Sequence, residues 1–340
     1  MRYTPMDRSP ASLRVGLIGA GGISAVHAAA WQHLGATVLV YSRDGAGQLA
    51  AEYGFEAVPS LAELWDQVDV VDIVTPTPTH RDFTLEAIER GKHVVCEKPL
   101  ARTGAQADEM VRAASRAGVQ LFPGHVVRYF PEYARAHESV SAGRIGTVAT
   151  CRFRRVSAAP GQDWFFDEAA SGGIVMDQMI HDLDQAEWFA GPVTEVFARS
   201  VAETSSTGPV ASATVTLRHA GGAISQCYGV WGPAHLPFGT SFLIAGDGGI
   251  LGHDSATDDS VRVMTAPTRT DGGYLPPGDG ASSPYTTQIA DFATSLTSGA
   301  APRVTAADGA RAIHLAEAAL ASIREQVPVA VPAPESLEVS

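Results

Sequence analysis

The sequence predicts an α/β fold: a doubly wound parallel sheet in the N-terminal third, then an α+β region with a large, open, mostly antiparallel sheet. Residues 13–122 alternate short Val/Ile/Leu runs with helical stretches, a pattern typical of parallel strands buried on both faces. Beyond Pro123 the strand-like runs lengthen and meet at short glycine turns, which indicates antiparallel pairing. The length of 340 residues fits about two domains.

The first region is expected to form one domain over residues 13–124, after a disordered extension at 1–12. Gly91 and Gly118 each follow a helical stretch, where glycine accepts the positive φ that ends a helix. Strands are expected at 13–19, 36–41, 68–75, 93–96 and 119–122, with helices up to residue 34 and near 48–53, 81–90 and 105–117.

The second domain is expected to span residues 125–340. Its helices are predicted at 125–143, 171–189, 286–298 and 305–325, and its strands at 147–157, 193–202, 211–218, 223–231, 238–246, 250–252 and 327–331. The last helix and strand could pack back toward the first domain. The segment 253–283 is rich in Gly, Pro, Asp and Ser, and we expect a loop around one short strand at 261–266.

Composition and charge narrow the classes of partner. The formal net charge is −13, which argues against nucleic acid or an anionic membrane as the main partner. The three cysteines, Cys96, Cys151 and Cys227, form no C-x-x-C pair, so no zinc site, other metal site or disulfide framework is expected. The N-terminus has no apolar signal core and no run is long enough to span a membrane, so we expect a cytoplasmic protein.

A glycine-rich turn joins the first expected strand to the first helix. Gly19, Gly21 and Gly22 precede Ile23 and Ser24 in the order G-A-G-G-I-S. Glycine lets the backbone turn sharply toward a pyrophosphate, and the helix N-terminus offers amide donors. Ser24 replaces the usual third Gly or Ala but is small enough for close packing. The pattern predicts a Rossmann-type dinucleotide-binding domain; the alternative is a tight turn that binds no ligand.

The end of the second strand bears on the choice between NAD and NADP. NAD-binding domains usually carry an acid there for the ribose hydroxyls, whereas NADP-binding domains use a cation for the 2′-phosphate. Ser42 stands where the acid is expected, and Arg43 follows it. A hydroxyl beside a guanidinium suits a phosphate, so NADP is the expected preference and NAD the alternative. In the other interpretation Arg43 covers the adenine while Asp44 binds the ribose.

Two further segments, 75–101 (TPTPTH…GKHVVCEKPLA) and 171–184 (SGGIVMDQMIHDLD), carry a resemblance. Together with the glycine turn, they make nearly the whole chain resemble the glucose–fructose oxidoreductase/inositol dehydrogenase family, Gfo/Idh/MocA. The most specific pieces are Glu97-Lys98-Pro99 after a strand and Asp177-x-x-x-His181 after a glycine pair. The resemblance implies two domains, a nicotinamide cofactor and a polyol or sugar substrate.

Lys98 follows a buried strand, at the sheet edge where ligands bind in such folds. A positively charged nicotinamide nearby would lower the pKa of this lysine. The resemblance implies that Lys98 is catalytic, that it also contacts cofactor and substrate, and that Glu97 belongs to the cofactor site. The alternative for an isolated lysine is a solvated surface side chain. The sequence leaves open whether the Lys98–Pro99 bond is cis or trans.

Asp177 and His181 are four residues apart on a predicted helix, which would place both on one face. Histidine is suited to proton exchange near neutral pH. The resemblance implies that His181 is the general acid/base at the substrate oxygen and that Asp177 orients the substrate or Lys98. The alternatives are a helix-surface pair or a hydrogen-bonded core histidine.

Other residues are weaker candidates. Arg128 could contact the cofactor or a substrate hydroxyl, or form an interdomain ion pair. His80 could cap the next helix or touch the pyrophosphate. Trp164 could form the floor of a sugar-binding site or belong to the core. The remaining candidates, along the cofactor or substrate, are Thr75, Pro76, Thr77 and Tyr129.

These features predict an NAD(P)-dependent dehydrogenase or reductase that moves a hydride between the nicotinamide and a hydroxyl or ketone carbon of a polyol or sugar. One alternative is a glycosidase-like enzyme that uses a tightly held NAD for transient oxidation. Others are a non-catalytic ligand-sensing protein and a reductase of an imine or a tetrapyrrole. The open antiparallel sheet in relatives pairs with another subunit, so a homodimer or homotetramer through the C-terminal sheet is expected.

Overall fold

The computed structural model describes residues 5–6, 9–205, 208–256 and 283–333. The described part of the chain divides into two compact units. The first holds the described residues up to Phe130 together with 283–310, and the second holds 131–256 and 311–333. The expected loop at 253–283 and its strand at 261–266 lie almost wholly outside the described residues.

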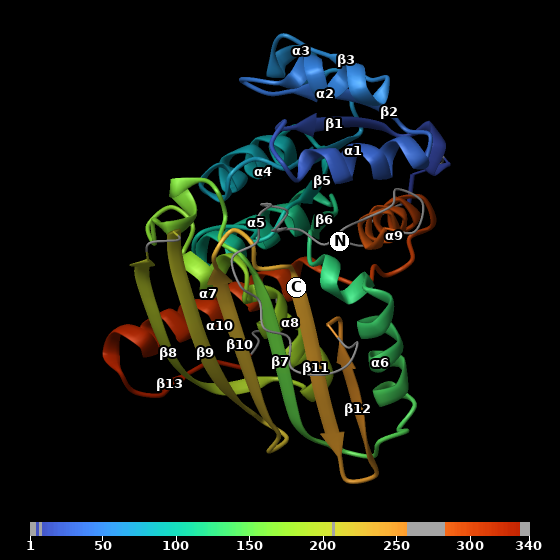
Figure 1. Ribbon diagram of the computed structural model, residues 1–340. Coiled ribbons are helices and arrows are strands. Elements are labelled where there is room, and N and C mark those ends of the chain that lie inside the picture. The colour runs from blue at the N-terminus through green and yellow to red at the C-terminus, as the bar shows by residue number, and fades with distance from the viewer. Residues whose placement is uncertain (1–4, 7–8, 206–207, 257–282, 334–340) are drawn as a thin grey trace. The chain divides into compact units, whose positions relative to one another are not determined.

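The first unit is built on a parallel six-stranded sheet in the order β3-β2-β1-β4-β5-β6 (Figure 1). This is the strand order of a doubly wound dinucleotide-binding domain, so the predicted Rossmann fold is confirmed. Its strands are β1 Arg14–Ile18, β2 Thr37–Tyr41, β3 Glu56–Ala57, β4 Val70–Ile73, β5 His93–Cys96 and β6 Leu121–Pro123. The short β3 and the helix α3 Leu61–Trp65 were not predicted.

The helices of the first unit are α1 Ser24–His33, α2 Ala46–Tyr53, α3, α4 His80–Glu89, α5 Gly104–Ala117 and α9 Pro284–Ser298. A single core cluster joins β1, β2, β4 and β5 to α1 and α9. Trp31 of α1 and Phe292 of α9 are both fully buried in it. The segment after residue 282 therefore returns to the first sheet through α9, which packs against α1.

Residues 9–12 had been assigned to a disordered extension. In the structure Pro10–Ser12 form a short 3-10 helix, η1, and the Met6 N–H donates to the carbonyl of Leu296 at 2.9 Å. The described residues of this segment are therefore attached to the first unit, partly through α9.

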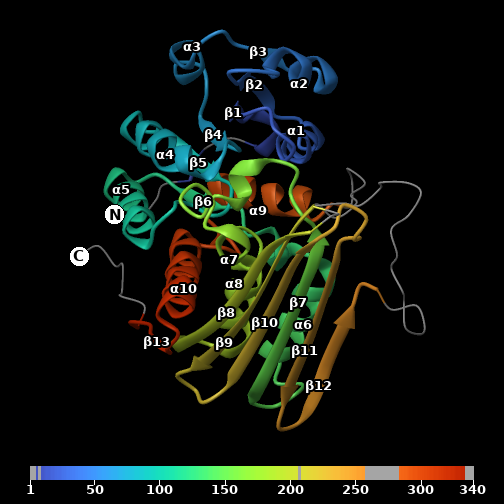
Figure 2. The same cartoon turned by 60° about the vertical axis from the view of Figure 1, so that its left-hand side comes forward.

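The second unit is built on a seven-stranded sheet in the order β12-β11-β7-β10-β9-β8-β13 (Figure 2). All its pairs are antiparallel except β7 with β10, which confirms the predicted mostly antiparallel sheet. The strands are β7 Val148–Ala158, β8 Val193–Ser205, β9 Gly208–His219, β10 Ile224–Gly232, β11 Gly239–Gly246, β12 Gly249–Asp254 and β13 Val329–Ala330. The last strand thus pairs with β8 in the second sheet.

The remaining helices are α6 Pro131–Ser141, α7 Gly173–Asp177, α8 Ile180–Ala190 and α10 Ala306–Glu325, with short 3-10 turns η2 Thr77–Thr79, η3 Val126–Tyr129 and η4 Asp163–Phe166. The helix predicted at 125–143 is interrupted. Phe130, between η3 and α6, is extended, with φ −62° and ψ 127°. A residue that precedes proline is disfavoured in the helical region, and Pro131 follows directly.

Candidate active site

The glycine-rich turn follows β1. Gly19 has φ +117°, and a Cβ there would lie 2.9 Å from the carbonyl oxygen of Val74. Its N–H donates to the carbonyl of Tyr41 at 2.8 Å. The turn is therefore held against the ends of both β2 and β4, and only glycine fits at its first position.

Gly21 and Gly22 differ from Gly19, because neither has a positive φ and a Cβ on either would meet nothing within 4 Å. The packing of the protein itself does not require glycine at these two positions. Ile23 is the N-cap of α1, and no side chain caps this helix. The hydroxyl of Ser24 is fully buried and has no hydrogen-bond partner. Open space before an uncapped helix N-terminus fits the pyrophosphate of a dinucleotide.

This contrast predicts different outcomes for two matched variants. Gly19→Ala is expected to lower the free energy of unfolding by about 1–3 kcal/mol, because alanine is strained at positive φ and its Cβ meets Val74. Gly21→Ala is expected to leave the free energy of unfolding within about 0.5 kcal/mol of the wild type and to weaken dinucleotide binding. Urea unfolding and calorimetric titration measure both quantities. Equal stability losses in the two variants would contradict the prediction.

The loop after β2 carries the residues assigned to cofactor choice. Ser42 is half-buried and Arg43 is exposed. Within the described chain Arg43 forms no ion pair. The next loop residue, Gly45, approaches the glycine turn, because a Cβ on it would lie 3.4 Å from Cβ of Ala20. Ser42 and Arg43 therefore lie on a loop that adjoins the dinucleotide cradle.

Thr75, Pro76 and Thr77 follow β4 directly. Thr79 Oγ1 lies 2.7 Å from Thr75 Oγ1 and 2.8 Å from the Pro76 carbonyl oxygen, so its hydroxyl is held at the turn after β4. His80 is buried, and its Nε2 and Nδ1 lie 2.7 and 2.8 Å from the carbonyls of Thr75 and Pro99. Burial lowers the pKa of His80. Neither expected role of His80, capping or contact with pyrophosphate, describes these contacts; the ring links the turns after β4 and β5.

The Glu97-Lys98-Pro99 turn follows β5, and the Lys98–Pro99 bond is cis. Lys98 is half-buried. Glu97 is 6% exposed, and its Oε2 accepts the N–H of Lys98 at 3.0 Å. A Cβ on Gly124 would lie 2.6 Å from Glu97 Oε1, so glycine is needed there for the carboxylate to fit. The protein itself therefore holds the Glu97 carboxylate, which the sequence analysis had assigned to the cofactor.

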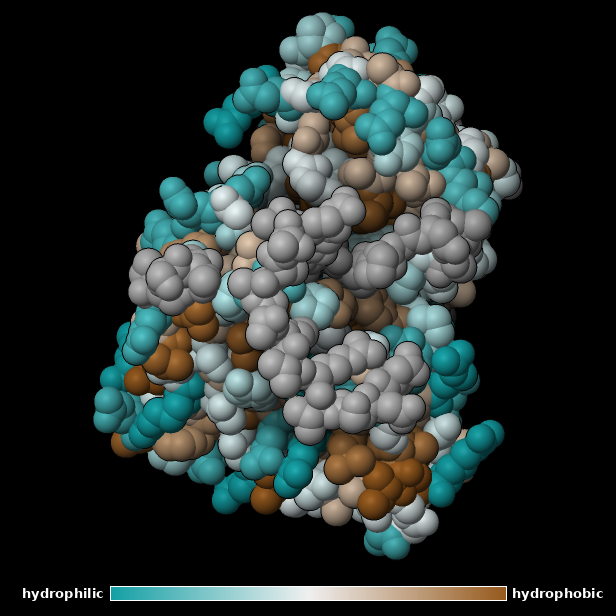
Figure 3. All heavy atoms as spheres, viewed as in Figure 1, coloured by the Kyte–Doolittle hydropathy of each residue, from teal (hydrophilic) through white to brown (hydrophobic). Residues whose placement is uncertain are grey.

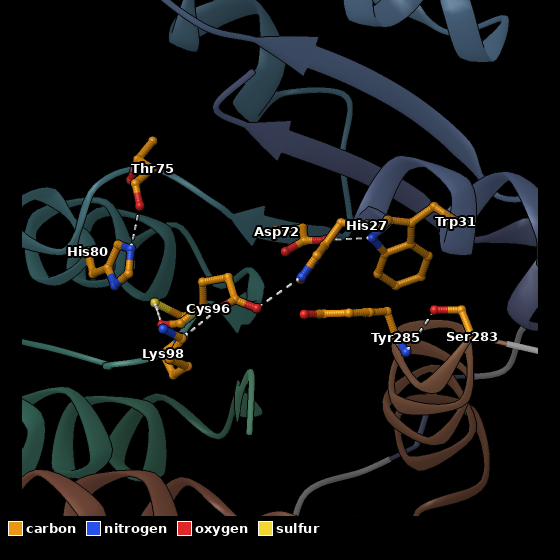
Figure 4. A network of polar contacts seen from close by, with 10 residues as sticks. His27, Trp31, Asp72, Thr75, His80, Cys96, Lys98, Ser283 and Tyr285 are labelled. Atoms are coloured by element: carbon orange, nitrogen blue, oxygen red, sulfur yellow. Dashed lines mark hydrogen bonds and ion pairs between the residues drawn. The ribbon is translucent and has the colours of Figure 1, made fainter. Parts of the chain in front are cut away.

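The partner of Glu97 was missed by the sequence analysis. His27 of α1 lies between Glu97 and Asp72 of β4, and Trp31 donates to the same Asp72 carboxylate (Figure 4). One signal was visible in the sequence: Asp72 interrupts the apolar run V-D-V-V-D-I-V, and an acid in a buried strand needs a partner.

The second segment, 171–184, lies in the second unit, and its predicted helix at 171–189 was wrong in one respect. Asp177 is the last residue of α7, and His181 lies in the first turn of α8, so the two residues are not on one continuous helix. Asp177 is 4% exposed and His181 is half-buried.

The residues between Asp177 and His181 explain the break. The Gln178 amide N–H group donates to the carbonyls of Arg155 on β7 and Val230 on β10 at 3.1 and 3.3 Å, and its Oε1 accepts the Ser157 hydroxyl at 2.7 Å. Met179 packs onto β10, where a Cβ on Gly229 would lie 2.5 Å from its Cγ. Gln178 and Met179 thus fix the junction of α7 and α8 to the sheet, which sets the positions of Asp177 and His181.

A buried ion pair lies one residue beyond His181. Arg155 of β7 donates to both oxygens of Asp182, at 2.9 and 3.1 Å, and the two side chains are 3% and 0% exposed. Burial raises the pKa of Asp182, although Arg155 opposes the shift. The first turn of α8, which carries His181, is therefore tied to β7.

Three of the weaker candidates make side-chain contacts inside their own units. Arg128 is buried and lies 3.3 Å from the Asp308 carboxylate, and the Tyr129 hydroxyl donates to Asp291 at 2.7 Å. These contacts all lie in the first unit, so the ion pair of Arg128 is an internal one. In the second unit Trp164 is half-buried and stacks on Phe165 with ring centroids 3.9 Å apart.

The described residues offer neither a metal site nor a membrane-spanning helix. That part of the chain contains no group of three or more His, Cys, Asp or Glu side chains that could hold a metal ion. It also contains no helix with the length and apolar character that a membrane crossing needs. The three cysteines are buried free thiols.

The parallel sheet with its glycine turn, together with an antiparallel α+β unit, defines a two-domain protein of the Rossmann dinucleotide-binding class. Residues 13–125 match the model of the oxidoreductase family with an NAD-binding Rossmann fold, and residues 133–251 match the Gfo/Idh/MocA C-terminal domain. The chain therefore belongs to the Gfo/Idh/MocA family of oxidoreductases, which confirms the resemblance inferred from the sequence.

Individual relatives resemble the chain over most of its length. It is 32% identical to the 1,5-anhydro-D-fructose reductase of Ensifer adhaerens, over 87% of this chain and 92% of that one. It is 29% identical to the myo-inositol 2-dehydrogenase of Thermotoga maritima, over 92% of this chain and 97% of that one. Among solved structures, GenD2 from gentamicin A biosynthesis, in complex with NAD, has a TM-score of 0.82 and 25% identity, with 98% and 99% of the two chains covered.

Proposed function

We propose that this protein is an NAD(P)-dependent dehydrogenase or reductase that acts on a CH–OH group, or the corresponding ketone, of a polyol or sugar. One observation carries the proposal: the family match extends over both units, and relatives similar over most of the chain are a reductase of an anhydro-sugar and a dehydrogenase of an inositol. A protein that only sensed a ligand would not need Lys98, Asp177 and His181 together.

We assign the catalytic roles of Lys98, Asp177 and His181 from the chemistry of their side chains. When bound, the nicotinamide supplies the acceptor or donor of the hydride. In oxidation His181 accepts the hydroxyl proton, and in reduction it returns a proton to the same oxygen. The Lys98 ammonium stabilises negative charge on that oxygen, and Asp177 orients the substrate or Lys98. Lys98 belongs to the first unit and the other two to the second, so the proposal requires both units to act on one substrate.

The rest of the proposed cofactor site belongs to the first unit. Gly19, Gly21, Gly22 and Ile23 would bind the pyrophosphate, since the turn is open and α1 is uncapped. Thr75, Pro76 and Thr77 would lie along the ribose and nicotinamide. The internal contacts of Arg128 and Tyr129 favour a supporting role for these two residues.

A substrate panel tests the proposed function. The purified protein is mixed with inositols, aldoses, anhydro-sugars and their keto forms, with NAD(H) and NADP(H) in turn, and absorbance is followed at the band of the reduced nicotinamide. Turnover of at least one polyol or sugar is expected. With a simple glycoside added to the same panel, its hydrolysis with no net change in the absorbance would instead support the glycosidase-like alternative. A folded protein that binds neither dinucleotide would overturn the proposal.

We further propose that NADP is preferred over NAD. Ser42 takes the place of the usual acid after β2, and the exposed Arg43 guanidinium is available for a phosphate. Arg43→Ala is expected to weaken NADP binding by about 1.5–3 kcal/mol, because a hydrogen bond between charged groups is lost, and to change NAD binding little. Calorimetric titration of both cofactors measures this. Tighter binding of NAD than NADP by the wild type would remove the proposal and favour Asp44 as the ribose ligand.

We also propose that copies of the chain associate through the outer face of the second sheet, as a homodimer or homotetramer. Registered strand pairs place six exposed apolar side chains on this one face: Phe197, Val201, Ile224, Tyr228, Leu243 and Ile250. Figure 3 shows hydrophobic side chains gathered over the lower ends of β11 and β12. The same face also carries polar side chains such as Arg152 and Arg154, and such a mixture of exposed apolar and polar side chains fits a protein interface. Sedimentation equilibrium tests the assembly; a monomer at micromolar concentration would contradict it.

A further inference from the structure

A buried chain of charged side chains runs through the first unit (Figure 4). Nδ1 of His27 lies 2.8 Å from Asp72 Oδ2, and Nε2 lies 3.1 Å from Glu97 Oε1. The indole N–H of Trp31 donates to the same oxygen of Asp72 at 2.7 Å. The side chains of His27 and Asp72 are 0% exposed, and that of Glu97 is 7% exposed. The chain links α1 and β4 to the turn that follows β5.

The geometry indicates that His27 is an imidazolium. Each ring nitrogen faces a carboxylate oxygen, and only the doubly protonated ring can donate to both. Burial alone would lower the pKa of His27, but the charge and hydrogen bond of Asp72, with those of Glu97, raise it to about 10. His27 in turn holds the pKa of Glu97 below its ordinary value, although burial opposes this shift. Two buried carboxylates thus share one buried cation.

No other group described near His27 takes its role as the cation between the two carboxylates. The Tyr285 ring of α9 has its centroid 6.2 Å from that of His27. Lys98, beyond Glu97, lowers the pKa of Glu97 less than His27 does. Cys96 is a thiol whose pKa is raised by burial, so it remains neutral. Among these neighbours, His27 is the cation that contacts both carboxylates.

Glu97 connects His27 to the backbone of the proposed catalytic lysine, Lys98. Its second oxygen, Oε2, accepts the backbone N–H of Lys98 at 3.0 Å, while Oε1 is held by His27. The carboxylate therefore bridges α1 and the backbone from which the Lys98 side chain starts. Gly124 leaves the room for this bridge, since a Cβ there would lie 2.6 Å from Oε1. A change at His27 is thereby transmitted to the position of Lys98.

We propose that His27 is a positioning residue of the reaction: its imidazolium, clamped between Asp72 and Glu97, fixes the Glu97 carboxylate and through it the backbone of Lys98. The inference rests on the proposed function of Lys98. It assigns the buried cluster of His27, Asp72 and Glu97 a role in turnover as well as in folding. A misplacement of a reacting group by about 1 Å is enough to cost about 10²-fold in rate.

A double-mutant cycle tests the proposal. His27→Gln and Glu97→Gln are each expected to lower kcat by about 10- to 100-fold, and the double variant is expected to be no slower than the slower single one. His219→Gln is the matched control, because His219 is also a buried histidine with both nitrogens bonded, at 2.6 and 2.8 Å, but lies in the second unit. It is expected to lose stability and keep kcat. Wild-type kcat in folded His27→Gln, or multiplicative losses in the double variant, would overturn the proposal.

A second measurement needs neither turnover nor cofactor. Nitrogen-15 NMR of histidine-labelled protein is expected to show one imidazole that stays cationic above pH 8, absent from His27→Gln and titrating at lower pH in Glu97→Gln. If His27→Gln does not fold, the comparison of wild type with Glu97→Gln still decides. The absence of such a cationic ring would overturn the proposal. Failure of the proposed function is distinct: it would appear as wild-type turnover in Lys98→Met, whatever the state of His27.

Discussion

His181→Ala is expected to lower kcat by about 10²- to 10⁴-fold, because general acid–base catalysis supplies a factor of that size. In oxidation His181 is the side chain to which the proposal assigns the hydroxyl proton. The dinucleotide Kd is expected to stay within about threefold of the wild type, since the cradle lies in the first unit and His181 in the second. Steady-state kinetics and calorimetric titration of the cofactor measure the two quantities.

Lys98→Met provides the companion experiment. Methionine keeps most of the length and apolar character of the lysine stem but removes the ammonium that would stabilise negative charge on the substrate oxygen. A loss of at least about 10²-fold in kcat is expected, the size seen when one such donor is removed. Near-wild-type turnover in either variant would reject that residue's catalytic assignment. Loss of dinucleotide binding in His181→Ala would contradict the separation of cofactor and acid–base roles.

The fold could be predicted from the sequence because its signals are local. The continuous apolar runs at β1, β4 and β5 indicated buried parallel strands, and the alternation along β7, β9 and β10 indicated a sheet with one open face. The break between α7 and α8 could not be predicted in the same way. Gln178 and Met179 have ordinary helix propensities, and the break depends on carbonyls and a glycine of distant strands.

The candidate site was predictable to a similar degree. The glycine turn and the two segments around Lys98 and His181 are short motifs and were visible. The partner of Glu97 was not, because His27 lies 70 residues away along the chain and one helical turn inside an alanine-rich stretch. Arg128 and Tyr129 were assigned to ligands, yet their partners Asp308 and Asp291 come from the last third of the chain. An acid in a buried strand, such as Asp72, signals that a partner is needed, but no local pattern identifies a partner that is distant along the chain.

The largest expected effect on stability comes from breaking the Arg155–Asp182 ion pair, which joins β7 to the first turn of α8. Removal of one partner leaves a charge buried without compensation, so Asp182→Ala and Arg155→Ala are each expected to lower the free energy of unfolding by about 3–5 kcal/mol. Glu86→Gln, which removes the half-exposed i,i+4 pair with Arg90, is expected to cost less than about 0.5 kcal/mol and serves as the control. Urea unfolding measures all three.

Replacement of both charges separates the pair's contribution to stability from its contribution to the site. Burial raises the pKa of Asp182 despite the contact with Arg155, which indicates that the pair does not fully offset the cost of removing the carboxylate from water. Arg155→Met/Asp182→Leu is therefore expected to be more stable than either single alanine variant. Its kcat is nevertheless expected to fall, because the bidentate contact that ties the His181 turn of α8 to β7 is gone. Full stability with full turnover in this double variant would show that the pair is dispensable for both.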